Sequence, residues 1–278
     1  MTHPLVLRCG GRPVGRYLAG ADLPARLSPR PYLHPVTTLH GTPVTEERPA
    51  DHLHHLGVSV AVPDVDGRNF WGGRTFVRDQ GPTELDNHGE QRHDGWKLRD
   101  PDGFVEDLTW TSGGTDVLRE RRTVAATGLT ADAWALDFTF SLTNPGDRDL
   151  SIGSPATNGR PGAGYGGFFW RAPKAPAPPD VFTAGHDGEP AVHGRTADWL
   201  ALRGPDWTLV FAGATDDTRE DPWFVRTDEY PGVGSSLAWD ARLPVPAGGT
   251  VVRRVVTVVA DGRLDRAGAA ALVRKALS

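Results

Sequence analysis

Histidines crowd one short stretch of this sequence. Three of the ten histidines, His52, His54 and His55, fall within four positions directly after Asp51. Unperturbed histidine titrates at about pH 6.5 and can therefore accept or release a proton near neutrality. The stretch precedes residues 57–62, whose alternation predicts a strand. We therefore expect His52 and His54 on one side of an extended segment and His55 on the other. A hydrogen-bonded cluster that orders a loop, or a solvated surface, is the non-catalytic alternative.

A second polar stretch, residues 86–94, holds His88 and His93 among acids and an arginine. If it forms a loop that faces His52 and His54, the four histidines make one pocket able to transfer protons. Imidazoles are also common ligands of transition metals, and three are sufficient for a site. The same four histidines are therefore candidate ligands of a divalent transition metal, although their spacing matches no diagnostic motif.

Glycines precede an aromatic strand at residues 164–171 that ends in Arg171. The glycines indicate a close approach of the backbone, and a guanidinium at this point could donate two parallel hydrogen bonds to a carboxylate or to sugar hydroxyls. An arginine paired with an acid at the end of a strand is the structural alternative.

Residues 221–230 combine aromatic rings, an arginine and acids, including Glu229. Strand alternation would place Trp223 and Val225 on one face and Phe224 and Arg226 on the other. An aromatic face beside an arginine and an acid suits a sugar, whose C–H face stacks on the ring while its hydroxyls bind the polar groups.

Composition excludes several classes of protein. The net charge of −5 comes from interspersed charges, which argues against nucleic acid as a partner. No run of about 18 apolar residues predicts a membrane span, and residues 1–4 do not begin a signal peptide, so we expect a cytoplasmic protein. The single cysteine, Cys9, cannot form an intramolecular disulfide and is expected in the core. Phosphate-binding glycine loops, Gly-x-Ser-x-Gly elbows and reactive thiols are all missing from the sequence.

Alternating or continuous apolar runs predict strands at residues 5–9, 14–18, 32–39, 57–62, 103–110, 117–125, 133–142, 199–202, 207–211 and 250–260. Only residues 264–277 have helical spacing, with Asp265 as a capping residue. Strands and helices do not alternate, so nothing favours a parallel sheet. We therefore predict an all-β protein, a single large antiparallel β-sandwich of supersandwich type over residues 1–278, with one C-terminal helix at about residues 264–277.

Together these stretches resemble the bacterial family usually labelled PmoA-like, whose name is borrowed from a membrane-bound methane mono-oxygenase subunit. The likeness covers nearly the whole chain and rests mainly on the Asp-His-x-His-His-x-Gly run at residues 51–57. Leu53 and Leu56 stand here where that family has Pro and Arg. The resemblance implies a β-sandwich similar in outline to the galactose-mutarotase group and an association with sugar catabolism. The positions that it carries over, without assigned chemistry, are His52, His54, His55, Trp71, His88, Arg171, Trp223 and Arg226.

We therefore expect an enzyme that acts on a sugar or a sugar-derived acid by histidine acid/base chemistry, as a lyase, an epimerase or a hydrolase. His52 and His54 or His88 would exchange protons, while Arg171 and Arg226 would orient the substrate or stabilise an oxyanion. The substrate would also contact His55, Trp71, Trp223 and Glu229. Two alternatives stay open, a non-catalytic carbohydrate-binding or accessory protein and a metal-dependent oxygenase or lyase with histidine ligands.

Overall fold

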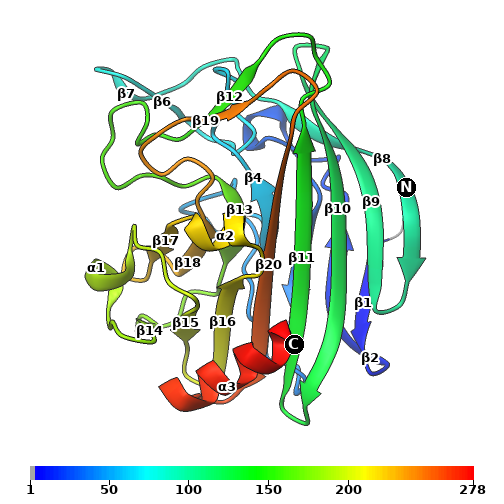
Figure 1. The fold of residues 1–278 in the computed structure, drawn as a ribbon, viewed down its shortest axis with the longest axis vertical. Helices are drawn as coiled ribbons and strands as arrows, with labels where there is room; N and C mark the ends of the chain where they lie inside the picture. Colours follow the sequence, from blue (N-terminus) through cyan, green and yellow to red (C-terminus); the bar gives the residue numbers. More distant parts are fainter. Residues whose placement is uncertain (1–3) are drawn as a thin grey trace.

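Two large antiparallel sheets make up most of the structure, a computed structural model that describes residues 4–278 (Figure 1). The first sheet contains, in spatial order, β1 (Leu5–Cys9), β2 (Arg12–Leu18), β3 (Tyr32–Val36), β4 (Val58–Ala61), β13 (Gly167–Arg171), β18 (Gly232–Ser235) and β17 (Trp223–Arg226). The second contains β14 (Asp180–Thr183), β15 (Leu200–Arg203), β16 (Trp207–Gly213), β20 (Thr250–Asp261), β11 (Ala133–Thr143), β10 (Thr115–Thr130), β9 (Gly103–Ser112) and β8 (Glu90–Asp100).

Smaller elements connect and cover these sheets. A three-stranded sheet contains β19 (Leu243–Val245), β12 (Leu150–Gly153) and β5 (Asp64–Val65), and a hairpin pairs β6 (Thr75–Val77) with β7 (Gly81–Thr83). The helical segments are a 3₁₀ turn at Ala25–Leu27, α1 (Glu189–Val192), α2 (Asp216–Glu220) and α3 (Arg266–Leu277). None of the helices that the structure describes is long and apolar enough to cross a bilayer.

The main core lies between the two large sheets. Strand β11 alternates as its sequence predicts, with Phe138 and its neighbours of the same parity buried against the other sheet. From the opposite sheet, Phe168 of β13 meets Phe138 edge-on, with ring centroids 5.5 Å apart. These facing side chains make the two layers a sandwich. The expected all-β sandwich is confirmed.

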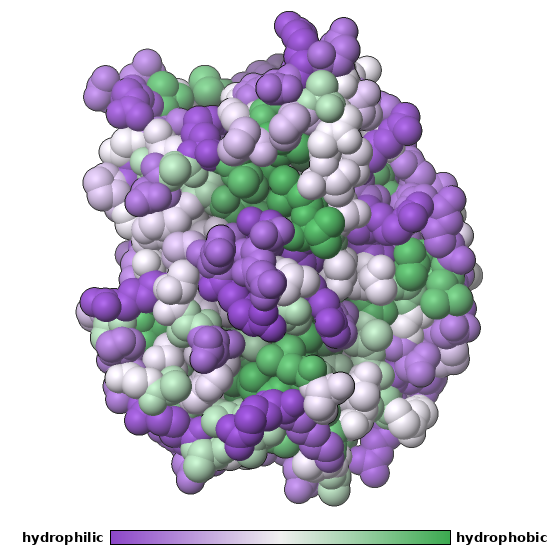
Figure 2. All heavy atoms as spheres, in the orientation of Figure 1, coloured by the Kyte–Doolittle hydropathy of each residue, from purple (hydrophilic) through white to green (hydrophobic). Residues whose placement is uncertain are grey.

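Helix α3 covers part of the outer face of the eight-stranded sheet. Its residues Ala269 and Val273 pack on a second core that includes Val256 and Val258 of β20. Asp265 caps the helix, because its carboxylate accepts the backbone N–H of Gly268 at 2.7 Å. The expected C-terminal helix is therefore confirmed, beginning at Arg266. On the face viewed in Figure 2, hydrophobic surface occurs in separate patches divided by hydrophilic side chains.

One long strand differs from expectation. Residues 90–100 form edge strand β8, although residues 90–94 belong to the polar stretch that we consider above as a loop. Two bulges interrupt its ladder with β9, between His93 and Gly95 and between Trp96 and Leu98. Each bulge inserts an extra residue and shifts the alternation of side chains. The apolar periodicity that would have predicted a strand is therefore absent from the sequence.

Candidate functional site

Several of the expected site residues lie on the outer face of the seven-stranded sheet. In β13, Phe168 and Trp170 belong to the inter-sheet core, whereas Phe169 packs in a separate aromatic cluster outside the sheet. Strand β17 follows the predicted alternation, with Trp223 facing the core and Phe224 facing outward. The outer face of the sheet therefore bears the side chains of Phe169, Arg171, Phe224 and Arg226.

The histidine stretch covers this face as a tight loop and not as an extended segment. The backbone N–H of His55 donates to the carbonyl of His52 at 2.9 Å, which closes a turn. As a result His52 stacks on His55, with ring centroids 4.6 Å apart and planes inclined by 20°. His54 meets His55 edge-on at 4.8 Å. The expectation that His55 faces away from His52 and His54 is wrong, because a turn does not alternate its side chains as a strand does.

Arg171 lies behind the histidine loop. Its side chain is 0% exposed, and Nε and Nη2 both donate to Oε2 of Glu46, at 3.1 and 2.9 Å. Nη1 lies 3.3 Å from Nδ1 of His55. A guanidinium can only donate, so Nδ1 accepts and the proton of neutral His55 is on Nε2. Arg171 is placed to orient His55, whereas the sequence-based hypothesis had it orient the substrate.

His52 pairs with the acid that precedes it. Its Nδ1 lies 3.3 Å from Oδ2 of Asp51, and its side chain is 32% exposed. The ring of Tyr230 packs on its other flank, with centroids 4.6 Å apart. Partial burial acts to raise the pKa of the Asp51 carboxyl, but nearby Arg171 and the His52 contact together outweigh it and lower the pKa. Asp51 is therefore a carboxylate held beside an accessible imidazole.

The other two histidines of the loop are held neutral. Burial, reinforced by the positive charge of Arg30 and by His52, lowers the pKa of His54 to about 3. Burial also lowers the pKa of His55 well below its ordinary value, with further contributions from His54 and His52. Both side chains are consequently uncharged hydrogen-bonding groups near neutral pH.

Arg30, which sequence analysis did not single out, organises the loops around the site. It is 1% exposed and has no carboxylate partner among residues 4–278. Its guanidinium donates to the carbonyl oxygens of Leu27, Ser28, Trp71 and His54, the last at 2.7 Å, and to the hydroxyl of Ser59. Five acceptors thus satisfy a buried cation. The only sequence signal for it was an arginine between two prolines.

A Gly-Gly pair fits closely against His54. A Cβ added at Gly72, where φ is +100°, would lie 2.7 Å from both His54 Cβ and the carbonyl oxygen of Leu27. A Cβ at Gly73 would lie 3.0 Å from the His54 ring. His88 approaches from the other side, and its Nε2 donates to the Gly73 carbonyl oxygen at 2.7 Å. This hydrogen bond supports the loop beside His54. The His88 side chain itself lines a neighbouring groove and not the space beside His52.

The histidine loop and the outer face of the seven-stranded sheet enclose a cleft of about 400 Å³, which we call the histidine cleft. Its wall includes Trp71, whose ring packs 4.6 Å from that of Tyr165. The lining side chains include Asp51, His52, His54, His55, Trp71, Arg74, Arg160, Tyr165, Phe224, Arg226, Glu229 and Tyr230. Aromatic rings, neutral imidazoles and three arginines therefore meet in one space. Such a lining favours a ring-shaped polar ligand that carries an anionic group.

Arg226 projects into this cleft over the ring of Phe224, 4.8 Å from its centroid. Its Nη1 donates to Glu189 Oε1 at 3.3 Å and to the carbonyl oxygen of Val225, and it lies 3.1 Å from Nδ1 of His193. All of these contacts, within the described part of the chain, use Nη1. Nη2 is available to a ligand.

Besides Arg171 behind the loop and His88 in the neighbouring groove, two more of the expected residues lie outside the cleft. Trp223 is buried in the inter-sheet core, and its indole donates to the carbonyl oxygen of Ala197. His93 pairs with Glu106 at the edge of the eight-stranded sheet. The proposed set of four histidines is therefore not assembled, and residues 4–278 hold no group of three or more His, Cys, Asp or Glu side chains arranged to bind a metal ion. Strand parity places Trp223 in the core, and His93 lies apart because residues 90–100 form the edge strand of the other sheet.

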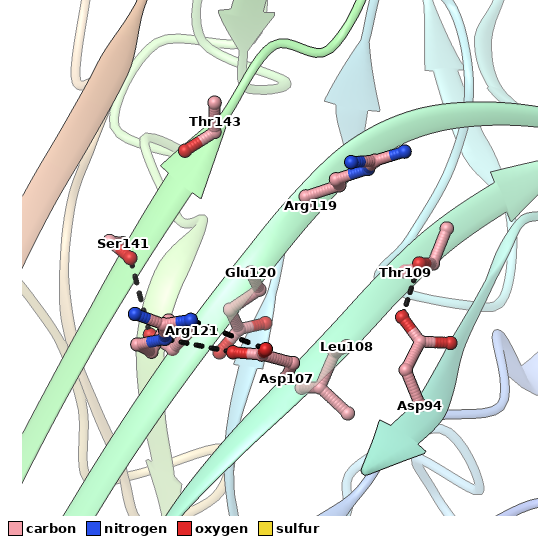
Figure 3. A pocket seen from close by; sticks show the side chains of 9 residues that line it. All are labelled: Asp94, Asp107, Leu108, Thr109, Arg119, Glu120, Arg121, Ser141 and Thr143. Carbon is pink, nitrogen blue, oxygen red and sulfur yellow. Dashed lines mark hydrogen bonds and ion pairs between the residues drawn. The ribbon is translucent and has the colours of Figure 1, made fainter. Parts of the chain in front are cut away.

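A larger groove of about 500 Å³ crosses the outer face of the eight-stranded sheet. Figure 3 shows side chains from β8 to β11 that are bonded to one another across the strands. Arg121 donates to Asp107 at 2.8 Å, and Thr109 donates to Asp94 at 2.5 Å. This groove has no aromatic ring or histidine in its lining. Paired surface charges explain its polarity, and the histidine cleft remains the candidate site.

Among solved structures, the chain is similar to heparan sulfate lyase HepC from Pedobacter heparinus, at 12% identity and a TM-score of 0.29 over 63% of this chain and 22% of the lyase. A heparinase III matches at 12% identity and a TM-score of 0.28 over 75% of this chain and 23% of that one. The chain thus spans less than a quarter of the length of either lyase. A likeness at this level carries no argument about activity. No curated protein matches this chain.

The family model that matches corrects the resemblance drawn from the histidine run. It covers residues 4–274 and describes a family of unknown function, DUF6807, and not the PmoA-like family. The Asp-His-x-His-His-x-Gly pattern, with Leu53 and Leu56 in place of Pro and Arg, was therefore not specific enough to identify a family. The chain belongs to the family of unknown function DUF6807.

Proposed function

We propose that this protein is an enzyme that acts on a sugar or a sugar-derived acid by histidine acid/base chemistry in the histidine cleft. The observation that carries the proposal is the placement of His52. It is the histidine of the loop that is both partly exposed to the cleft and paired with a carboxylate, at 3.3 Å from Asp51.

In this proposal His52 exchanges a proton with the substrate. Asp51 lies beside Nδ1 at ion-pair distance but outside hydrogen-bond geometry. Its carboxylate stabilises the imidazolium that forms when Nε2 takes a proton from the substrate. The stacked ring of His55 and the tilted ring of Tyr230 pack against the His52 ring and hold it in place. Proton removal beside a carboxylate begins lyase and epimerase reactions of sugar acids, and the same base can activate water in a hydrolase.

The substrate class follows from the remaining lining. The half-buried Tyr165 ring, backed by the buried Trp71 ring 4.6 Å away, offers a surface for the C–H face of a sugar. Arg226 and Arg160 bring positive charge to the same cleft, which Arg74, paired with Glu84, also lines. An anionic substituent such as a carboxylate would form charge-assisted hydrogen bonds with these guanidinium groups. Sugar acids are therefore favoured over neutral sugars.

A non-catalytic carbohydrate-binding protein is the second candidate. The low pKa values of His54 and His55 favour it, because permanently neutral imidazoles act as hydrogen-bonding groups and not as proton carriers. The two functions differ in their dependence on His52. Binding alone would tolerate an amide at this position, whereas proton transfer would not.

The test is a turnover assay over a library of neutral sugars and sugar acids, with wild type, His52→Gln and His40→Gln compared. His40 is a matched control, because it is a surface histidine 3.6 Å from Asp132 and lies outside the cleft. We expect His52→Gln to lower kcat by at least about a hundredfold, the usual contribution of a positioned general base, and His40→Gln to leave it unchanged. Binding of a library member without turnover, unaffected by His52→Gln, would support the non-catalytic function.

A further inference from the structure

We propose that a second ligand site, independent of the histidine cleft, lies beside edge strand β8 and binds a sugar-sized hydroxylated ring with an anionic substituent. The site is a cavity of about 210 Å³, and its lining includes Leu5, Tyr17, His93, Trp96, Arg99 and Glu106. It opens where β8 and β9 of one sheet approach β1 and β2 of the other. The proposed function does not depend on it.

The two bulges of β8 build this site. His93, Trp96 and Arg99 are spaced by three, so an uninterrupted strand would point them to alternate faces. The extra residues at the bulges instead place His93 opposite Leu108, Trp96 opposite Glu106 and Arg99 opposite Phe104, on the inward face of β9. All three side chains therefore line the same cavity. Bulges that redirect side chains in this way are over-represented beside functional sites.

The floor of the cavity is a fixed polar group. Glu106 is 1% exposed; its Oε1 lies 2.5 Å from Nδ1 of His93, and its Oε2 accepts the hydroxyl of Tyr17. Arg122, also buried, donates to the Tyr17 hydroxyl at 2.9 Å. With Nδ1 of His93 bound to the carboxylate, Nε2 is left for a ligand hydroxyl. The imidazole is thus oriented as in a histidine–carboxylate pair.

The walls suit a ring with a negative charge. Trp96 lies with its ring centroid 4.7 Å from that of His93, and the guanidinium of Arg99 sits 5.6 Å from the Trp96 centroid. In the described part of the chain Arg99 has no acidic partner within ion-pair distance. A sugar ring stacked on Trp96 could therefore donate a hydroxyl to His93 and place a carboxylate beside Arg99.

The test follows each tryptophan by fluorine NMR on the full chain labelled with 5-fluorotryptophan, titrated with D-glucuronate and with D-glucose. Trp96→Phe assigns the resonance of this site, and Trp71→Phe assigns that of the histidine cleft. We expect a saturable shift of the Trp96 resonance that is stronger with glucuronate. Arg99→Gln, an exposed change that leaves the core intact, should abolish the preference for the acid. His93→Gln should weaken binding about tenfold, the loss of one hydrogen bond.

Movement of the Trp96 resonance that persists in Trp71→Phe would show that this site is separate from the histidine cleft. The proposal is overturned if neither sugar moves the Trp96 resonance at tens of millimolar, or if Arg99→Gln and His93→Gln, both folded by thermal melting, titrate as wild type. A shift confined to the Trp71 resonance would overturn the second site but support binding in the histidine cleft. The experiment therefore distinguishes failure of this inference from failure of the proposed function.

Discussion

Arg171 and His55 form a buried pair on the outer face of the seven-stranded sheet, with Nη1 of the arginine 3.3 Å from Nδ1 of the histidine. Glu46 balances the charge of Arg171, and the ring of Tyr230 covers it, 4.8 Å from the guanidinium carbon. One arginine therefore sets the tautomer of His55 and supports the ring that flanks His52. A reaction in the histidine cleft would therefore depend on Arg171, although the Arg171 side chain does not line the cleft.

Replacement of Arg171 by Met should destabilise the protein. The change leaves buried His55 without its donor and Glu46, whose side chain is 30% exposed, without its partner. A buried polar group left unsatisfied costs about 1–3 kcal/mol. We expect a reduction of this size in the free energy of unfolding by urea. Arg121→Met is the matched control, because Arg121 pairs with Asp107 on the surface and should give no measurable change. Equal, small effects of both changes would show that Arg171 does not support the loop.

The layers of the fold could be predicted because they depend on local alternation. Phe138 and its neighbours of the same parity in β11 already indicate which face of the strand is buried. The same alternation in β17 placed Arg226 on the face that bears the cleft, but it also placed Trp223 in the core, where a tryptophan cannot bind substrate.

The arrangement of the candidate site could not be predicted, because it depends on long-range contacts and on irregular backbone geometry. The turn at His52 brings His55 under His52, and no periodicity in the sequence encodes that turn. His93 is separated from the loop histidines because residues 90–100 pair with β9 at the edge of the other sheet, and the bulges of β8 hid this strand from its periodicity. Arg30 binds carbonyl oxygens, which carry no side-chain signature in the sequence. Backbone acceptors and inserted residues are therefore the features that sequence patterns missed.

Arg30→Lys should loosen the histidine loop although the charge is kept. A lysine ammonium has three donors on a flexible stem and cannot reproduce the five bonds of the guanidinium. At least two buried acceptors would lose their donors, at a cost of about 1–3 kcal/mol each. We expect a lower melting temperature and faster hydrogen exchange at Trp71 and in residues 52–57. Arg26→Lys, on the adjacent exposed 3₁₀ turn, is the control. Unchanged exchange in Arg30→Lys would refute this role.

Stability should fall as the pH decreases below that at which unfolded histidine titrates. In the unfolded chain His54 has a pKa of about 6.5, whereas in the folded chain burial lowers it to about 3. Between these values the unfolded state binds more protons, so the free energy of unfolding rises with pH. His55 acts in the same direction. Each such group contributes a slope of up to about 1.4 kcal/mol per pH unit within its window.

Urea unfolding between pH 5 and pH 7 measures this slope. The buried carboxyls Glu106 and Asp221, whose pKa values are raised by burial, contribute with the opposite sign. His34 and His193, whose pKa values are also lowered by burial, contribute to the wild-type slope, so the informative quantity is the difference between variants. We expect His54→Gln to flatten the curve and His40→Gln, at an exposed histidine, to leave it as in wild type. A His54→Gln slope equal to that of wild type would mean that His54 titrates alike in both states.

Gly72→Ala should displace His54. The new Cβ would overlap His54 Cβ and the carbonyl oxygen of Leu27, in addition to the strain of a positive φ. Gly41→Ala isolates the strain alone, because Gly41 has a similar φ of +93° with nothing within 4 Å of the added atom. We expect losses of unfolding free energy of about 1 kcal/mol for Gly41→Ala and about 2–4 kcal/mol for Gly72→Ala. Equal losses of unfolding free energy in the two variants would mean that the His54 loop moves to accept the new Cβ at no energetic cost.

Arg226 should determine the preference for acids in the histidine cleft. Nη1 is held by Glu189 and the carbonyl oxygen of Val225, so the guanidinium is fixed in place while Nη2 remains available to a substrate carboxylate. A hydrogen bond to a charged group contributes about 1.5–3 kcal/mol, which corresponds to a roughly ten- to hundredfold change in affinity. We therefore expect Arg226→Gln to lower kcat/KM by that factor for a sugar acid and by much less for its neutral parent. Glu189→Gln, which keeps a hydrogen-bond acceptor for Nη1, should preserve the preference. An equal loss for acid and neutral sugar in Arg226→Gln would instead assign Arg226 to the architecture of the cleft, since only a contact with the carboxylate can distinguish the two substrates.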